Sequence, residues 1–494
     1  MKPTAAFALA SFLASRGLAT DLLTPEKIEA DITTEELQRN LWNFNYIADR
    51  NGGNRAFGLP GYKASVDYVL ERLQRPDFHK FTSWVQPFNH TFNQVRSISV
   101  TGPDGEDVEV VALIYNPGTP LPDGITAPLI DTPVDDERGS GCFEDQWEGI
   151  DATGRIALVK RGTCAIADKL RLAKAHGALA VILYNNVEGR PTQATLGAES
   201  IGQVVPVGTI RQEVGEAWKE RLAADEELVV NLTVDAIFEE RETWNVFAET
   251  KEGDPDSVVV LGAHLDSVQA GPGVNDDGSG SSALLEIATA FRRYDGLRNR
   301  VRFAWWGAEE SGLVGSLHYT STLSPAEADR VRFYFNYDMI GSPYPVFTVY
   351  DGDNPGDSFG AQRLHDYLTS RGYPASYGAF GTSSDYVGFL ELGIPSSGLF
   401  TGAGAPTDPC YHLACDTTDN IDADALTANA RAAGAVAAQL ALDSLEGLPP
   451  RANATVNLRH RSRIGRQFDR WRRAAELASV EKSCSAHGEK VSTV

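Results

Sequence analysis

The stretch VVVLGAHLD, from Val258 to Asp266, decides the class of fold. Its first six residues are apolar or glycine without interruption, which is typical of a strand buried on both faces of a parallel sheet. Two polar residues end the stretch. Side chains two positions apart on a strand project from the same face, so we expect His264 and Asp266 to lie side by side. Taken alone, such a pair is usually a polar cap on a strand end.

Strand-like and helix-like runs alternate from Trp244 onward. This alternation predicts an α/β fold with a mostly parallel, mixed and twisted sheet that is sandwiched by helices. Side chains with chemical roles are expected at the carboxyl ends of the strands, where the sites of such folds gather. The expected strands span residues 258–262, 301–306, 331–336, 347–350 and 397–400, and the expected helices span residues 281–294 and 358–370.

Two pairs of adjacent carboxylates follow the first two of these strands. Asp276 and Asp277 stand between a glycine-rich loop and a helix, where a carboxylate commonly caps the helix, although one of the two could equally bridge metal ions. Glu309 and Glu310 follow the strand at 301–306 and would repel each other unless a metal or a proton neutralised one of them. Paired glutamates are common on surfaces, but these follow a buried strand. Glu310 as a ligand and Glu309 as a general base would suit metal-assisted hydrolysis.

The strand at 331–336 leads to Asp338, and a later loop presents Tyr411 and His412 between Cys410 and Cys415. A disulfide between these two cysteines would close a small ring and hold the tyrosine and the histidine still. The alternative is that the thiols bind zinc themselves. Only two cysteines are nearby and disulfides suit secreted proteins, which favours the ring.

In this order, the motifs resemble those of the co-catalytic zinc aminopeptidases of the aminopeptidase Y type, with secreted fungal leucine aminopeptidases the most similar in layout. The resemblance runs from about residue 33 to residue 448. It implies two zinc ions per chain, with Asp276 bridging both ions. It assigns His264 and Asp338 to one ion and Glu310 and His412 to the other.

The same resemblance implies roles for three further side chains. Asp266 would orient His264, since a zinc-bound imidazole needs a carboxylate or carbonyl on its other nitrogen. Glu309 would act as base and then as acid, and Tyr411 would donate a hydrogen bond to the developing oxyanion. The peptide between Asp276 and Asp277 would be cis.

A second unit interrupts the chain between residues 125 and 234. The sequences GRIALVKRGTC (154–164), KLRLAKAHGALAVILYNN (169–186) and VPVGTI (205–210) resemble the protease-associated domain. The helix face that carries Leu170 and Ala173 is expected to be core, and nothing in the unit looks catalytic. Residues 20–124 are then expected to be an N-terminal helical part of the peptidase domain, with a possible short pro-segment, and residues 235–450 its zinc-binding remainder.

The ends of the chain and its cysteines indicate secretion. Residues 1–19 have the charged start, apolar middle and small-residue end of a signal peptide. Cys142 and Cys164 are expected to form a second local disulfide, which leaves Cys484 alone.

Residues 451–494 form a basic tail, which we interpret as peripheral or removable. The candidate glycosylation sites are Asn89, Asn231 and Asn453.

Net charge and motifs together define the expected function. The formal charge of −23 argues against nucleic acid or an anionic membrane as a partner. We expect a secreted, extracellular, monomeric enzyme that hydrolyses the first residue from peptides and proteins by metal-activated water. Phe400 and its neighbours could line an apolar, leucine-like pocket or simply be a core strand. The alternatives are a glutamate-carboxypeptidase-type zinc exopeptidase, a glutaminyl-cyclase-like enzyme, and a catalytically dead binding protein on the same fold.

Overall fold

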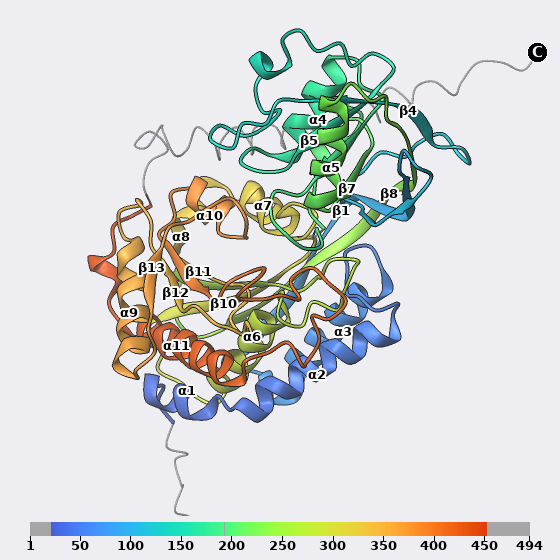
Figure 1. Cartoon of the computed structure of the whole chain (residues 1–494). Coiled ribbons are helices and arrows are strands. Elements are labelled where there is room, and N and C mark those ends of the chain that lie inside the picture. Colours follow the sequence, from blue (N-terminus) through green and yellow to red (C-terminus); the bar gives the residue numbers. More distant parts are fainter. Residues whose placement is uncertain (1–20, 192, 452–494) are drawn as a thin grey trace, which may run out of the picture.

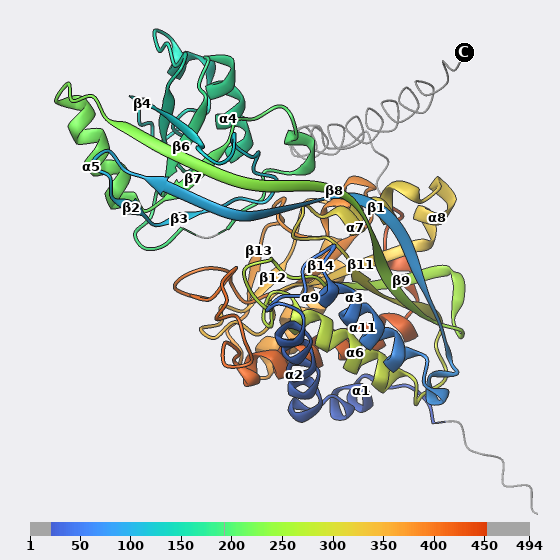
Figure 2. The same ribbon diagram turned by 90° about the vertical axis from the view of Figure 1, so that its right-hand side faces the viewer.

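The computed structural model describes residues 21–191 and 193–451, which form two lobes joined by two long strands (Figures 1 and 2). The strands β1 (Phe81–Thr101) and β8 (Val229–Thr250) pair antiparallel over almost their whole length, with one register shift between Val95 and Ser97. We call residues 95–236 the insert lobe and the other described residues the main lobe. Because β8 pairs in both lobes, they share one 14-stranded sheet.

In the main lobe the strands follow the order β13-β12-β14-β11-β9-β10-β8. The central strand β9 is parallel to β10 and β11, and β11 is parallel to β14, whereas β8 and β12 pair antiparallel with their neighbours β10 and β14. The sheet is therefore mixed but parallel at its centre. The strands are β9 (Asp254–His264), β10 (Asn299–Trp306), β11 (Val331–Tyr337), β12 (Thr348–Tyr350), β13 (Ser376–Gly378) and β14 (Ser396–Phe400).

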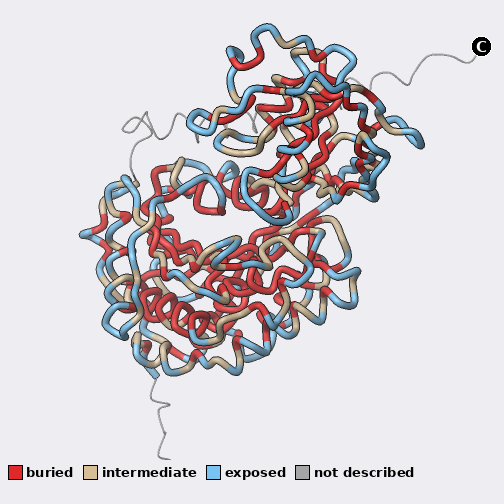
Figure 3. The backbone as a smooth tube through the Cα atoms, viewed as in Figure 1, coloured by how far each residue is buried: buried red, intermediate tan, exposed pale blue. Residues whose placement is uncertain are grey.

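The apolar run of β9 fills cores on both faces of the sheet. Val259 and Leu261 pack into one core, and Val258 and Val260 pack into the other, as the alternation of side chains in a strand requires. Both cores appear as buried backbone in Figure 3. The first core includes residues of α1 (Pro25–Asp31), α2 (Thr34–Arg50), α3 (Pro60–Leu73), α6 (Gly278–Phe291), α9 (Asp357–Ser370) and α11 (Ala423–Leu442). The second core includes residues of α7 (Val314–Thr322) and α10 (Val387–Glu391). The short helix α8 (Pro325–Arg330) lies between α7 and α10 in the sequence.

The insert lobe has its own parallel strands and two cores. Leu170 and Ala173 are fully buried in one core, as the sequence predicts, and Trp218 contributes to the other. The strands β4, β5, β6 and β7 run parallel, and β4 also pairs with β8. The elements are β2 (Asp107–Val108), β3 (Val110–Val111), β4 (Ile125–Asp131), β5 (Ile156–Lys160), α4 (Ile166–Ala175), β6 (Ala180–Tyr184), β7 (Val207–Ile210) and α5 (Gln212–Ala223).

The sheet with helices on both faces confirms the predicted fold class, although residues 81–101 differ from the expected helical part of the N-terminal region. These residues are the strand β1, because their pairing with β8 overrides the mixed local pattern. Within the described ranges, no helix is long and apolar enough to cross a membrane. The predictions for residues 1–19, Asn453, Cys484 and the tail beyond Arg451 fall outside the described residues.

One buried cation fixes the loop that follows β9. Arg55 is fully buried, and its guanidinium donates hydrogen bonds to the carbonyl oxygens of Leu265, Pro272 (2.8 Å) and Gly273 (2.6 Å). Its main-chain N–H also donates to the Ser267 hydroxyl at 2.9 Å. A buried guanidinium with this many acceptors is a rigid connector. The segment between α2 and α3 thus positions the loop that carries Asp276.

Replacing Arg55 by alanine should lower the free energy of unfolding by at least about 3 kcal/mol, because three buried carbonyl groups would lose a charged donor. The matched control is Arg50→Ala at the exposed end of α2, which should change stability by less than about 0.5 kcal/mol. Urea unfolding of both variants measures the difference. Equal stability of the two variants would contradict the connector role.

Candidate metal centre

Five side chains predicted as metal ligands come together at the carboxyl ends of β9, β10 and β11. They form two overlapping groups, His264 with Asp276 and Asp338, and Asp276 with Glu310 and His412. Within each group the possible ligand atoms lie within 4.8 Å of one another. Asp276 belongs to both groups, so its two carboxylate oxygens face two different sets of partners.

The imidazole contacts show how Asp276 is shared. One of its oxygens lies 3.1 Å from His264 Nε2, and the other lies 3.1 Å from His412 Nε2. Glu310 lies 3.0 Å from His412 Nε2, while Asp338 lies 3.6 Å from His264 Nε2. None of these five side chains is more than 13% exposed. The arrangement is a compact, nearly dry cluster of nitrogen and oxygen donors.

The chemistry of this donor set fits metal ions. One oxygen each of Glu310 and Asp338 is buried without a hydrogen-bond partner, which is costly unless a cation or proton satisfies it. Burial lowers the pKa of His264, but the surrounding carboxylates outweigh it and raise that pKa well above its ordinary value. The pocket therefore favours positive charge. Mixed imidazole and carboxylate donors suit zinc, and neutral imidazole is the form that would ligate it.

Asp276 and Asp277, whose roles as helix cap and metal ligand the residue pattern left open, make different contacts in the structure. Asp277 caps α6 by accepting from Gly280 N–H at 2.8 Å, and it also accepts from the N–H groups of His264 and Met339. It thereby ties together the ends of β9 and β11 and the start of α6. Asp276 instead points its carboxylate at the two histidines. The peptide between the two residues is cis, as the family resemblance implies.

Asp266 supports the centre with both its main-chain carbonyl and its carboxylate. The nearest acceptor for His264 Nδ1–H is the main-chain carbonyl of Asp266, at 3.1 Å, whereas its carboxylate is 3.8 Å away. That carboxylate accepts from the N–H groups of Glu309 (3.0 Å) and Glu310 (3.4 Å). Asp266 therefore holds the histidine with one group and the paired glutamates with another.

Glu309, the predicted general base, lies beside the cluster. Its carboxylate is 3.9 Å from His264 Nε2, and its side chain is only 9% exposed. Burial raises the pKa of Glu309 well above its ordinary value, and the charges of Asp385, Glu310 and Asp338 raise it further. A carboxylate in such surroundings is suited to take up a proton and return it.

Tyr411 and His412 lie in the ring closed by the disulfide between Cys410 and Cys415. The two aromatic rings stack with centroids 3.8 Å apart. Burial and the nearby carboxylates raise the pKa of Tyr411 well above its ordinary value, so its hydroxyl stays protonated and able to donate. The structure also contains the disulfide between Cys142 and Cys164.

Several supporting residues were not predicted from the sequence. Ser384 donates to Asp338 at 2.6 Å, and Asp416 accepts from the N–H groups of Asn275 (2.9 Å) and Asp276 (3.1 Å). Asp416 directly follows the disulfide ring, which was the one available signal for it. The main-chain carbonyl of Gln193, in the insert lobe, lies 3.0 Å from His412 Nδ1. No sequence pattern marks that contact.

The candidate glycosylation residues in the described ranges differ in accessibility. Asn89 is exposed, whereas the amide nitrogen of Asn231 donates to the Asp123 carbonyl and the Thr126 hydroxyl, both at 2.8 Å. Sugar attachment at Asn231 would have to replace these two hydrogen bonds. Modification of either residue stays a prediction.

Comparisons with known proteins identify the families to which the two parts of the chain are similar. The model of peptidase family M28 matches residues 245–437, and that of the PA domain matches residues 125–218. An aminopeptidase of Pseudomonas aeruginosa is 38% identical, over 86% of this chain and 84% of its own length. Leucine aminopeptidase 2 of Arthroderma otae is 36% identical, over 81% of this chain and 82% of its own length.

Two solved structures share the fold. An aminopeptidase from Aneurinibacillus sp. strain AM-1 is 28% identical with a TM-score of 0.72, and it aligns over 87% of this chain and all of its own. A zinc aminopeptidase from Bacillus subtilis is 27% identical with a TM-score of 0.66, over 86% of this chain and 97% of its own. The chain therefore belongs to peptidase family M28, as a metallo-exopeptidase of the aminopeptidase type that carries a PA domain.

Proposed function

We propose that this protein is an extracellular aminopeptidase that holds two zinc ions and removes the first residue from peptides and proteins. The observation that carries the proposal is the pair of donor groups that share Asp276, with Glu309 beside them. His264 and Asp338 would hold one ion, and Glu310 and His412 the other. When bound, the ions would polarise the scissile carbonyl and make water a stronger nucleophile.

The chain's own side chains would position the substrate and move the proton. Glu309 would take a proton from the attacking water and deliver it to the leaving amine. Tyr411 would donate its hydroxyl hydrogen to the oxygen that becomes negative during attack. Its stacking on His412 and the enclosing disulfide ring hold that donor in place before the substrate arrives. Preorganised donors of this kind need no rearrangement at the moment of reaction.

An apolar first residue is the preferred substrate in this proposal. Tyr350 packs on Phe380, Tyr386 and Phe400 with ring centroids 5.2–6.1 Å apart. Tyr386 stands two positions after Ser384, whose hydroxyl donates to Asp338, so one member of this aromatic group is tied closely to the metal cluster. Phe400 is the half-buried member, so it is the one that offers a surface to a leucine-like side chain.

The glutamate-carboxypeptidase alternative needs cations that recognise a C-terminal carboxylate. Arg161 of the insert lobe is the relevant residue, because it lies near Tyr411 and burial lowers its pKa. One arginine near Tyr411 is a weaker basis than the clustered cations that such a site requires. The dead-enzyme alternative predicts missing donors, whereas all five ligand positions and Glu309 carry suitable side chains.

Three further parts of the proposal concern the whole chain. Secretion rests on the signal-like start and on the two disulfides, which suit an oxidising compartment. The proposed boundaries are residues 125–234 for the PA domain and residues 20–124 and 235–450 for the peptidase domain. A monomer is proposed, with peptide and protein N-termini as the binding partners.

Replacing Glu309 by glutamine should leave zinc binding intact and lower kcat by about 10²–10⁴-fold, since only the proton acceptor is removed. The control is Glu71→Gln on the exposed surface of α3, which should behave like the wild type. Hydrolysis of a leucyl anilide and zinc content are measured on the same preparations. Wild-type turnover in the Glu309 variant would refute its role as the base.

Acetylation of the substrate amine should abolish hydrolysis of Leu-Gly-Gly, because an aminopeptidase requires a free amine beside its acidic side chains. Release of free leucine is compared for the acetylated and the unmodified peptide. A carboxypeptidase-type enzyme would instead release glycine from both peptides. That second pattern would exclude the proposed function in favour of the alternative.

A further inference from the structure

The two histidines of the metal cluster donate their outer hydrogen bonds to carbonyl oxygens of different lobes. His264 donates from Nδ1 to the Asp266 carbonyl, two residues along its own strand end. His412 instead faces the Gln193 carbonyl, 3.0 Å from its Nδ1 and 219 residues away in the chain. Gln193 lies in the insert lobe, between β6 and β7. The acceptor for His264 Nδ1–H thus belongs to the main lobe, whereas the acceptor for His412 Nδ1–H belongs to the insert lobe.

This outer contact determines what His412 can do at its inner nitrogen. Nε2 faces Asp276 and Glu310, so it must be free of hydrogen to ligate a metal ion. The remaining hydrogen then sits on Nδ1 and requires an acceptor. The Gln193 carbonyl supplies that acceptor, which fixes both the tautomer and the plane of the ring.

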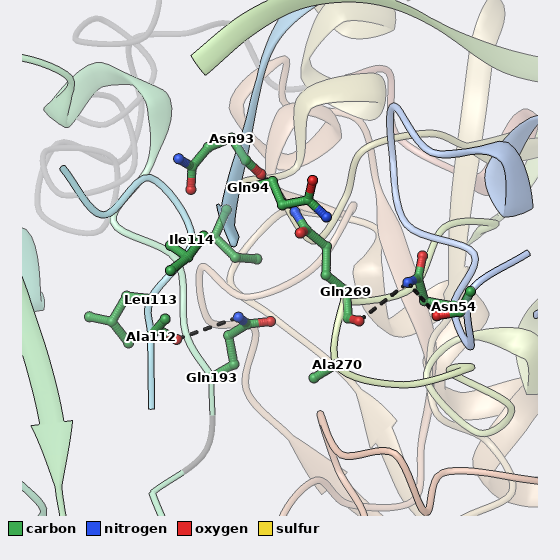
Figure 4. A pocket seen from close by; sticks show the side chains of 11 residues that line it. Asn54, Asn93, Gln94, Ala112, Leu113, Ile114, Gln193, Gln269 and Ala270 are labelled. Atoms are coloured by element: carbon green, nitrogen blue, oxygen red, sulfur yellow. Dashed lines mark hydrogen bonds between the residues drawn. The ribbon is translucent and has the colours of Figure 1, made fainter. Parts of the chain in front are cut away.

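The position of this carbonyl is set by the insert lobe itself. Ile114 N–H donates to the Ala194 carbonyl at 2.9 Å, Leu196 N–H donates to the Ile114 carbonyl at 3.0 Å, and the Gln193 side chain donates to the Ala112 carbonyl at 3.4 Å. Figure 4 shows Gln193 extended toward Ala112. The segment around Gln193 is therefore attached to residues 112–114.

The main lobe does not pack tightly against this side of the segment. A cavity of about 350 Å³ is lined by Ala112 and Gln193 from the insert lobe and by Asn54, Gln269 and Ala270 from the main lobe (Figure 4). The side-chain oxygen of Gln193 is buried there without a hydrogen-bond partner. The hydrogen bond to His412 is accordingly a discrete link between the lobes beside an open space.

We propose that the main-chain carbonyl of Gln193 is a positioning group for the metal centre. Through it, the PA-domain lobe determines how firmly the half formed by Asp276, Glu310 and His412 retains zinc. The inference rests on the proposed two-zinc function and adds a role for the insert lobe in it. The half formed by His264 and Asp338 has its own internal acceptor and does not depend on this link.

The direct test weakens one carbonyl without changing any side chain. Incorporating lactic acid in place of Ala194 converts the peptide bond after Gln193 into an ester, whose carbonyl is a poorer acceptor. The dissociation constant of one of the two zinc ions should rise by up to about tenfold, the lower end of the effect of losing an outer partner. The other ion should be unaffected. Zinc affinities are measured by competition with a chromogenic chelator.

The matched control places glycolic acid at Gly189, in the exposed part of the same connection between β6 and β7. This weakens the carbonyl of Glu188, which is outside the hydrogen bonds that attach Gln193 to residues 112–114. The control should retain wild-type zinc affinity and, like the Ala194 variant, a wild-type melting transition. Equal zinc affinities in the two ester variants, or equal weakening of both ions in the Ala194 variant, would overturn the inference. The wild-type titration tests the two-ion proposal separately, because a single bound zinc would refute that proposal itself.

Discussion

The concentration of carboxylates around Asp276 is the constraint on which the rest of the structure depends. Asp276, Glu309, Glu310 and Asp338 lie with two imidazoles in a nearly dry pocket, where like charges repel strongly. Without bound cations, the cluster must take up protons, as the raised pKa values of His264 and His412 indicate. The surrounding structure therefore has to hold these groups against their mutual repulsion.

Buried polar connectors around the cluster provide this restraint. Asp277 ties β9, β11 and α6 together, and Asp416 binds two successive N–H groups before the shared carboxylate. Arg55 holds the intervening loop by three carbonyl groups, and its positive charge partly offsets the acidic residues nearby. Each connector reaches the cluster from a different segment. The cluster is thus specified by tertiary structure, although three of its members, His264, Glu310 and Asp338, lie at or just after strand ends.

The sequence predicted the parts of this arrangement that depend on local pattern. The apolar run before His264 predicted a central strand. The same reasoning predicted that Glu310 and Asp338 lie just after two further strands. Local pattern could not decide between Asp276 and Asp277, because a helix cap and a shared ligand require the same residue type at the same place. The family resemblance pointed to Asp276, and the structure shows Asp277 as the cap.

Contacts that cross between segments could not be predicted. Nothing near Gln193 marks its carbonyl as a partner of His412, because any residue type offers that carbonyl. The strand β1 was also missed, since its pairing with β8 involves residues about 130–170 positions apart. The same pairing joins the two lobes in one sheet and brings the insert lobe to the edge of the metal centre.

The central claim is that two ions share Asp276. Anomalous diffraction at the zinc edge, from crystals of the zinc-loaded protein, tests it most directly. The account predicts two peaks, one beside His264 and Asp338 and the other beside Glu310 and His412, with Asp276 between them. A single peak, or two peaks that do not share Asp276, would contradict it.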